Sequence, residues 1–346
     1  MLCNELGISI IVPVYNAGDR FKPSLESLLS QTLDHSCYEI ILVDDGSTDD
    51  SGSICDEYAK NYPGLVRTFH QEASGHCSAP RNKGIDEARG EYLFFHDADD
   101  IMLPEACERM LNHAREWNSD VLVVRECMRW PDGTIKPITS YASDNKPSIP
   151  SVNTYADFLV SDMDARRLVR RSLVLENNLR FEETLSEEYL FCQKSLYYAK
   201  VISLANDYTY EWYMQWEEGN ISSSGHQSPV KTFDGRMYGI KEMLRFIDEK
   251  NAREIAYPYL YKKIFEHPVY RLMSTSMDQR NWEEESPRLG ELRDAIAGHW
   301  DDCIADKVKF TERAVIETLM AKSFSSIPAI RNLGKRPAGG RKEELA

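Results

Sequence analysis

The sequence lacks any apolar segment long enough to cross a bilayer. No run reaches the roughly 20 consecutive apolar residues that a spanning helix needs. The N-terminus also lacks the combination of charged, apolar and small residues that is typical of a secretion signal. We therefore expect a cytoplasmic protein.

Basic residues are few relative to acidic ones. The 346 residues contain 41 Lys and Arg against 56 Asp and Glu, which gives a formal net charge of −15. A nucleic-acid binder needs Lys and Arg to neutralise phosphates, so this charge argues against a nucleic-acid partner. An anionic ligand such as a nucleotide diphosphate would need a metal ion or a few well-placed arginines beside it.

Two common cofactor motifs are also missing. The eight cysteines include no C-x-x-C pair, which argues against a zinc site and predicts reduced, mostly packed thiols. No G-x-G-x-x-G sequence follows the first predicted strand, which argues against a nicotinamide-dependent dehydrogenase.

What is present is an α/β pattern. Apolar runs at 8–14, 39–43, 65–69, 92–95 and 121–124 predict strands, and the segments between them predict helices, including 80–88 and 104–117. Strands separated by helices predict a mainly parallel twisted sheet with helices on both faces. Ligands bind such sheets beyond the carboxyl ends of the strands, so polar residues there should converge on one edge. These residues are Tyr15, Asn16, Asp44, Asp45, Asp97 and Asp99.

The acidic run at 97–100 has two interpretations. Asp97, Asp99 and Asp100 follow an apolar strand. Crowded carboxylates are costly without a counter-charge, so a divalent metal is one interpretation. The other is an acidic loop that caps the helix near Pro104.

Four motifs occur in order at spacings that suggest a known family. They are IIVPVYN at 10–16, VDDGSTD at 43–49, PRNKG at 80–84 and GEYLFFHDADD at 90–100. With them, residues 7 to about 225 resemble the family 2 glycosyltransferases of GT-A fold. Ser74 and Gly75 before the PRN sequence, and EEYLF at 187–191, are most similar to the enzymes that add N-acetylglucosamine to the poly(ribitol phosphate) of wall teichoic acid. Related capsule and exopolysaccharide glycosyltransferases share much of the same sequence.

The resemblance implies a nucleotide-sugar site. Tyr15 could stack on the base, and Asp45 could accept the hydrogen of the uracil imide. A helix-capping turn is the alternative interpretation of 44–47. The residues expected to line the site are Pro13, Tyr15, Asn16, Asp44, Asp45, Arg81, Asn82, Asp97 and Ala98.

Arg81 and Asn82 are expected near a helix start, where backbone N–H groups favour a phosphate or ribose partner. The alternative is a surface arginine with a structural asparagine. Gly84 is expected to allow close packing of that helix.

The resemblance also implies a site for Mn²⁺ or Mg²⁺. Asp99 would be the metal ligand proper, and Asp97 would face the ribose or a metal-bound water. Carboxylate oxygens suit these ions. Asp100 is expected to support the other two.

A base is needed to take the proton from the acceptor hydroxyl, and the resemblance places it at Glu188, beside Glu187. A partly dry cleft would raise the pKa of such a carboxylate and make it a better base. The alternative is a solvated acidic helix start.

Three further groups of residues are candidates for contacts with substrate. By the resemblance, a loop at 218–223 is expected to cover the donor. The similar enzymes have a His at the position of Asn220, and the nearby His226 could take the place of that His. Aromatic residues could stack on sugar rings or pack in the core; they are Tyr210, Trp212 and Trp216. Arginines could contact an anionic acceptor, although a solvated face is favoured; they are Arg166, Arg167, Arg170 and Arg171.

The predicted domains follow from these assignments. Residues 1–226 are expected to form the catalytic domain, with a donor half at about 1–125 and an acceptor half at about 126–226. Prolines among polar residues from about 130 to 150 predict a loop or lid. Residues 227–328 are expected to be helical, and 329–346 to be a basic, disordered tail.

The predicted function is inverting, metal-dependent transfer of a sugar from a UDP-sugar donor to a hydroxyl group. The acceptor would be a glycan, polyol-phosphate or lipid-linked precursor of a cell-surface polymer. The alternatives are an inactive carbohydrate-binding or assembly protein of the same fold, and a sugar nucleotidyltransferase. The basic tail is compatible with peripheral contact at the inner face of an anionic membrane, and the helical region with a homo-oligomer.

Overall fold

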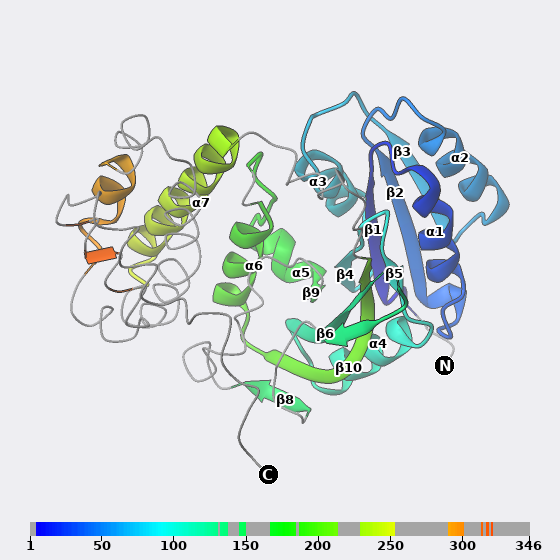
Figure 1. Ribbon diagram of the computed structural model, residues 1–346. Coiled ribbons are helices and arrows are strands. Elements are labelled where there is room, and N and C mark those ends of the chain that lie inside the picture. The colour runs from blue at the N-terminus through cyan, green and yellow to red at the C-terminus, as the bar shows by residue number, and fades with distance from the viewer. Residues whose placement is uncertain are drawn as a thin grey trace, which may run out of the picture. The chain divides into compact units, whose positions relative to one another are not determined.

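The computed structural model describes residues 5–130, 132–137, 145–149, 167–184, 187–213, 229–252 and 290–300, together with residues 313, 316, 317 and 320. The chain divides into two compact units, Met1–His226 and Gln227–Ala346. The first unit contains a large mixed sheet with helices beside it (Figure 1). The second contains the long helix α7 (Pro229–Glu249).

Ten described strands form one sheet. Its main path runs in the order β3-β2-β1-β4-β9-β6-β10-β5. The first four strands of that path are mutually parallel: β3 (Val66–His70), β2 (Tyr38–Asp44), β1 (Ile8–Val14) and β4 (Tyr92–Phe95). The others are β9 (Arg167–Arg170), β6 (Val121–Arg129), β10 (Ile202–Tyr213) and β5 (Ile101–Met102).

Strand β1 lies between β2 and β4, and helices cover both of its faces. Phe21 and Leu25 of α1 (Phe21–Leu29) belong to the same buried cluster as Ile10 of β1. Ile11, the next residue of β1, points to the opposite face. There a Cβ added at Gly84 of α3 (Ser78–Glu87) would lie 2.2 Å from the Ile11 side chain, so α3 approaches too closely for any larger residue. The predicted α/β fold and the close packing at Gly84 are confirmed.

The order of the strands places a topological switch point at the end of β1. The chain passes from β1 to β2 on one side and later to β4 on the other, so the loops after β1 and β4 diverge. Such a switch point is where open α/β sheets bind ligands. The other helices of this unit are α2 (Ser51–Asn61), α4 (Ala106–Glu116), α5 (Arg171–Glu176) and α6 (Glu187–Tyr198), with the short 3-10 helices η1 (Gly18–Arg20) and η2 (His35–Cys37).

The prediction of a loop or lid over 130–150 is wrong in part. It contains β7 (Ile135–Pro137), which pairs with β6, and β8 (Lys146–Ile149), which pairs with β10. The prolines do not prevent this pairing, because both are outer strands and a missing N–H can face away from the neighbour.

The expected solvated arginine face is also wrong for two of its members. Arg167 is 3% exposed. Arg170 forms ion pairs with Glu91 and Asp120, both at 3.2 Å, so it joins elements of the sheet. Arg166 lies outside the described residues.

Cysteine use is mixed. Cys37 is disulfide-bonded, so the prediction of reduced thiols is wrong at this residue. Spacing in the sequence gave no sign of it, because contacts between distant cysteines depend on the fold. The free cysteines among the described residues are Cys55, Cys77, Cys107, Cys127 and Cys192.

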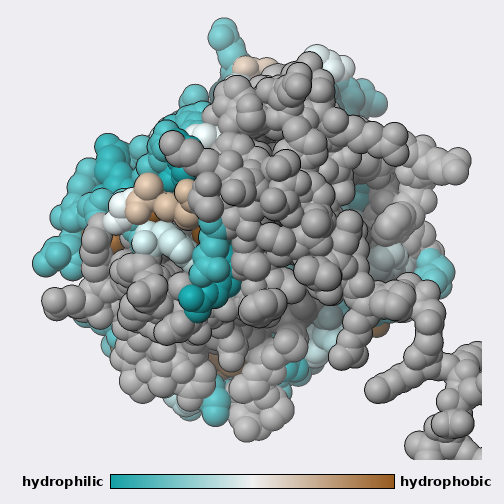
Figure 2. Space-filling model, turned by 60° about the vertical axis from the view of Figure 1, so that its left-hand side comes forward, coloured by the Kyte–Doolittle hydropathy of each residue, from teal (hydrophilic) through white to brown (hydrophobic). Residues whose placement is uncertain are grey.

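Within the described part of the chain, no helix is both long and apolar enough to span a membrane. On the face shown in Figure 2, the described surface is mostly hydrophilic. Among the described residues, the large exposed apolar side chains come from separate elements; they are Tyr15, Tyr62, Ile135, Leu175, Tyr208 and Tyr238.

Candidate functional site

The loop after β1 presents one aromatic ring and is fixed to the loop after β2. Tyr15 is 56% exposed, whereas Pro13 lies within β1 opposite Val43. Asn16 has a φ of +46°, a left-handed conformation that asparagine tolerates. Its side-chain oxygen accepts hydrogen bonds from the backbone N–H and the hydroxyl of Thr48, at 2.8 and 3.3 Å. Asn16 therefore holds Tyr15 in place at the sheet edge.

The adjacent acids Asp44 and Asp45 have different surroundings. Asp44 accepts hydrogen bonds from the Ser47 backbone N–H at 3.1 Å and from His70 Nδ1 at 3.0 Å. Burial raises the pKa of Asp44, but these hydrogen bonds outweigh burial and hold the pKa below the ordinary aspartate value. Asp44 therefore stays ionised and ties β2 to its neighbours.

Asp45 faces the segment that follows β3. Gln71 Nε2 donates to it at 2.6 Å, and Ser74 donates from its hydroxyl at 2.8 Å and from its backbone N–H at 3.1 Å. Asp45 is only 4% exposed. These donors fix the position of its carboxylate.

The acidic run divides into one buried residue and two accessible ones. Asp100 is 1% exposed and accepts hydrogen bonds from the Tyr210 hydroxyl at 2.7 Å and from the Tyr213 backbone N–H at 3.0 Å. The same Tyr210 hydroxyl accepts from the Asp97 backbone N–H at 3.2 Å. Asp100 thus anchors the loop to β10, while the side chains of Asp97 and Asp99 remain 36% and 49% exposed.

Arg81 lies at the centre of a group of carboxylates. It projects from α3, is 3% exposed and packs over the Phe181 ring at 5.3 Å. Its guanidinium lies 2.6 Å from Glu188, 3.0 Å from Asp97 and 3.4 Å from Glu187. Burial disfavours the charged guanidinium, yet the surrounding carboxylates, Glu188 foremost, raise the pKa of Arg81 well above its ordinary value. Through these ion pairs, the permanently charged Arg81 connects the loop after β4 to the start of α6.

Side chains of α3 and of its N-cap residue also contact the start of α6 and the segment before it. The Asn82 amide donates to the Phe181 carbonyl at 2.7 Å and accepts from the Phe181 N–H at 2.9 Å. The Cys77 thiol donates to Glu187 at 2.9 Å, and burial raises the pKa of this thiol, so it stays protonated. Asn82 thus positions Phe181, and Cys77 holds the side chain of Glu187.

The accessible acids suit a divalent cation that takes part of its coordination shell from a ligand. Asp97 and Asp99 supply hard carboxylate oxygens from the loop that follows β4. Among the described residues, however, no group of three or more His, Cys, Asp or Glu side chains could hold a metal by itself. Mg²⁺ and Mn²⁺ sites of this kind rely on one or two carboxylates plus phosphate oxygens and water.

The structure therefore brings the predicted residues of β1, β2, α3, β4 and α6 to the carboxyl edge of the parallel strands. Ala98 lies between the two accessible acids and is 9% exposed. Tyr210 is fully buried, so its predicted alternative role in the core is the correct one. The donor-covering loop at 218–223, His226 and Trp216 lie outside the described residues.

The sequence analysis missed Arg20, Gln71 and Cys77. Arg20, from η1, forms an ion pair with Asp99 at 3.4 Å. No motif marks any of the three, because each acts through a contact between segments distant in the sequence. The basic character of Arg20 just after the first strand was the one available signal.

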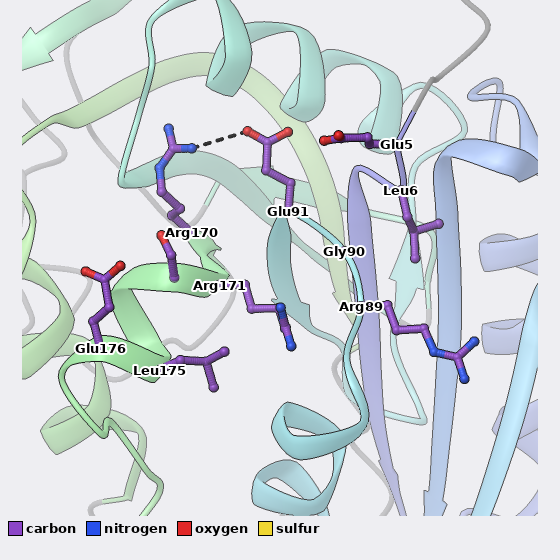
Figure 3. Close-up of a pocket in the computed structure, with 10 residues that line it drawn as sticks. Glu5, Leu6, Arg89, Gly90, Glu91, Arg170, Arg171, Leu175 and Glu176 are labelled. Atoms are coloured by element: carbon purple, nitrogen blue, oxygen red, sulfur yellow. Dashed lines mark hydrogen bonds and ion pairs between the residues drawn. The ribbon is translucent and has the colours of Figure 1, made fainter.

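A cavity of about 580 Å³ lies elsewhere, at the opposite edge of the sheet (Figure 3). Leu6 and Gly90, which line it, precede β1 and β4, whereas the acids follow these strands. Arg170 forms an ion pair with Glu91 in the lining of this cavity (Figure 3). This cavity does not coincide with the converging acids.

Comparison with known proteins identifies the family. The family model described as "Glycosyl transferase family 2" matches residues 9–182, which is half of the chain. The chain belongs to glycosyltransferase family 2, as the motifs predicted, and the predicted enzyme class, a glycosyltransferase, is confirmed.

Two curated relatives and one solved structure are informative. The poly(ribitol-phosphate) beta-glucosyltransferase of Bacillus spizizenii is 34% identical over 72% of this chain, which spans only 38% of that enzyme. The poly(ribitol-phosphate) beta-N-acetylglucosaminyltransferase TarP of Staphylococcus aureus is 26% identical over 93% of this chain and 89% of its own length. The crystal structure of S. aureus TarS residues 1–349 in complex with UDP-GlcNAc has a TM-score of 0.76 at 22% identity, covering 94% of this chain and 91% of that one. This last similarity confirms the fold.

Proposed function

We propose that this protein is an inverting, metal-dependent glycosyltransferase that moves a sugar from a UDP-sugar to a hydroxyl of a polyol-phosphate polymer. The observation that carries the proposal is the Arg81 cluster, which joins the acid expected at the donor, Asp97, to the acid expected at the acceptor, Glu188. A transferase needs both groups on opposite sides of one anomeric carbon. The names of the relatives and the nucleotide in the TarS crystal support the acceptor and donor classes.

The nucleoside would lie over the ends of β1 and β2. Tyr15 offers an exposed ring for the base, and the carboxylate of Asp45 is fixed by Gln71 and Ser74 for one edge contact. Pro13, Asn16 and Asp44 would shape this part of the site through the backbone. Asn82 would act by holding the Phe181 segment in place.

The diphosphate would lie at the acidic run. Asp99, with Asp97 beside it, would hold Mn²⁺ or Mg²⁺ together with phosphate oxygens. Such an ion would supply positive charge where negative charge develops on the leaving diphosphate. Ala98 places its backbone between the two acids.

Glu188 would accept the proton of the acceptor hydroxyl as the hydroxyl oxygen attacks the anomeric carbon. The bond from that carbon to the diphosphate oxygen breaks at the same time, and its electron pair leaves with UDP. Arg81, at 2.6 Å, orients the Glu188 carboxylate. Glu187, held by the Cys77 thiol, would keep α6 in place.

The test is release of UDP from a panel of UDP-sugars with Mn²⁺, in the presence and absence of poly(ribitol phosphate) or a lipid-linked acceptor. We expect acceptor-dependent release that falls by at least about 100-fold in Asp99→Ala and Glu188→Gln. The matched control is Glu183→Gln, an exposed acid just before α6. No turnover and no UDP binding would refute the proposal, and full turnover in Asp99→Ala would refute the metal assignment.

The predicted domain functions and location remain proposals. We propose that residues 1–226 carry catalysis, that the unit from 227 onward serves acceptor docking or self-association, and that the enzyme works at the inner face of the cell membrane. Acceptor-dependent turnover by the 1–226 fragment, compared with the full chain, separates the first role from the second.

A further inference from the structure

The accessible acid Asp99 already has a cation beside it. Nη1 of Arg20 lies 3.4 Å from its carboxylate, and the two side chains are 29% and 49% exposed. The Arg20 guanidinium also lies 5.9 Å from the centre of the Tyr213 ring, within the range of a cation–π contact. Arg20 therefore lies between the end of β10 and the residue expected to bind the metal.

The backbone just before Arg20 is held by the loop after β2 and by the first residue of α2. The N–H of Ala17 donates to the Ser51 hydroxyl at 3.0 Å, and the N–H of Gly18 donates to Asp49 at 3.2 Å. The Asp99 loop follows β4, on the other side of β1. The ion pair thus joins the loop after β1 to the loop after β4, at the switch point where we place the diphosphate.

We propose that Arg20 makes metal binding depend on the nucleotide: it competes with the divalent cation for Asp99 in the empty site and contacts the diphosphate in the filled one. This inference rests on the proposed function. The described residues contain no cluster able to hold a metal alone. Mg²⁺ sites commonly take one or two carboxylates and complete their coordination with substrate phosphates and water.

Electrostatics gives the direction of each effect. A divalent ion bound at Asp99 would lie a few ångströms from the Arg20 guanidinium, and the two cations repel. A diphosphate carries enough negative charge to interact favourably with both, and a guanidinium is well shaped to contact its oxygens. Because coupling between two ligands is reciprocal, the nucleotide should strengthen Mn²⁺ binding by the same factor as Mn²⁺ strengthens nucleotide binding.

The experiment measures Mn²⁺ binding without nucleotide, by electron paramagnetic resonance, and UDP binding with Mn²⁺, by calorimetry. In Arg20→Met we expect Mn²⁺ affinity without nucleotide to rise about tenfold and UDP affinity to fall about tenfold. Asp99→Asn in the Arg20→Met background should abolish the gain in Mn²⁺ affinity. Arg20→Lys should lie between wild type and Arg20→Met.

Lys22→Met is the matched control, because it removes one exposed cation two residues away. It should bind both ligands like wild type. Unchanged Mn²⁺ affinity or unchanged UDP affinity in Arg20→Met overturns the inference. If the wild type binds no UDP at all, the proposed function fails instead, and the Mn²⁺ measurement still reports on the competition at Asp99.

Discussion

Replacing Arg81 by Met would leave Asp97, Glu187 and Glu188 together without their shared counter-charge. Unit charges 4 Å apart attract by about 4 kcal/mol at an effective dielectric constant of about 20, before the cost of desolvation. Removing one partner from a fully buried ion pair costs about 3–5 kcal/mol.

The cost at Arg81 should be somewhat smaller, because the carboxylates are partly hydrated. Their side chains are 14%, 26% and 36% exposed at Glu187, Glu188 and Asp97, while the arginine itself is buried. We expect Arg81→Met to lower the free energy of unfolding by about 2 to 4 kcal/mol at neutral pH. Urea unfolding followed by circular dichroism measures this loss.

The dependence on pH distinguishes lost charge from lost packing. Protonation of the carboxylates at low pH removes both the attraction in the wild type and the repulsion in the variant. The stability difference should therefore shrink as the pH falls, whereas a packing defect would persist. Arg81→Lys keeps the charge without the forked geometry and should recover part of the loss. A difference below about 1 kcal/mol, typical of a surface pair, or one that is constant with pH would refute the reasoning.

Three further predictions concern other contacts. Hydrogen bonds to Asp56 and Asp44 raise the pKa of His70 above its ordinary 6.5. The stability that His70 adds is therefore complete below pH 6.5 and is lost as the pH rises through the raised pKa. Melting curves at about pH 6 and about pH 8 should show that the wild type loses its stability advantage over His70→Gln at the higher pH. Gly84→Ala should cost about 1–3 kcal/mol in urea unfolding, because its Cβ would meet Ile11. Asn82→Ala should lower the free energy of unfolding by about 1–3 kcal/mol, because the backbone N–H and carbonyl of Phe181 lose their hydrogen bonds to the amide. A variant as stable as the wild type would contradict this and show that water replaces the amide.

Local pattern was enough to predict the parallel part of the sheet. Apolar runs predicted β1 and β4 at their observed bounds, because strands covered on both faces are continuously apolar. Once the parallel order was inferred, the convergence of Tyr15, Asp45 and Asp97 followed from the strand ends. The mixed part was harder, since β7 and β8 are short and contain proline.

Contacts between distant segments could not be predicted in this way. The pairing of Arg20 with Asp99 and the three partners of Arg81 depend on how loops and helices meet. The same is true of Arg170, which was expected on a solvated face and instead bridges Glu91 and Asp120. A residue's charge is visible in the sequence, but its partner is set by the fold.

The hydrogen bonds between α3 and the segment before α6 have a consequence for engineering. Ser78 donates to the Glu182 carbonyl at 2.7 Å, next to the two Asn82 bonds to Phe181. A chimera that takes residues 126–226, the proposed acceptor half, from a relative would therefore lose these contacts unless residues 77–82 are exchanged together with 181–188. These two segments should therefore be treated as one unit in the design of such a chimera.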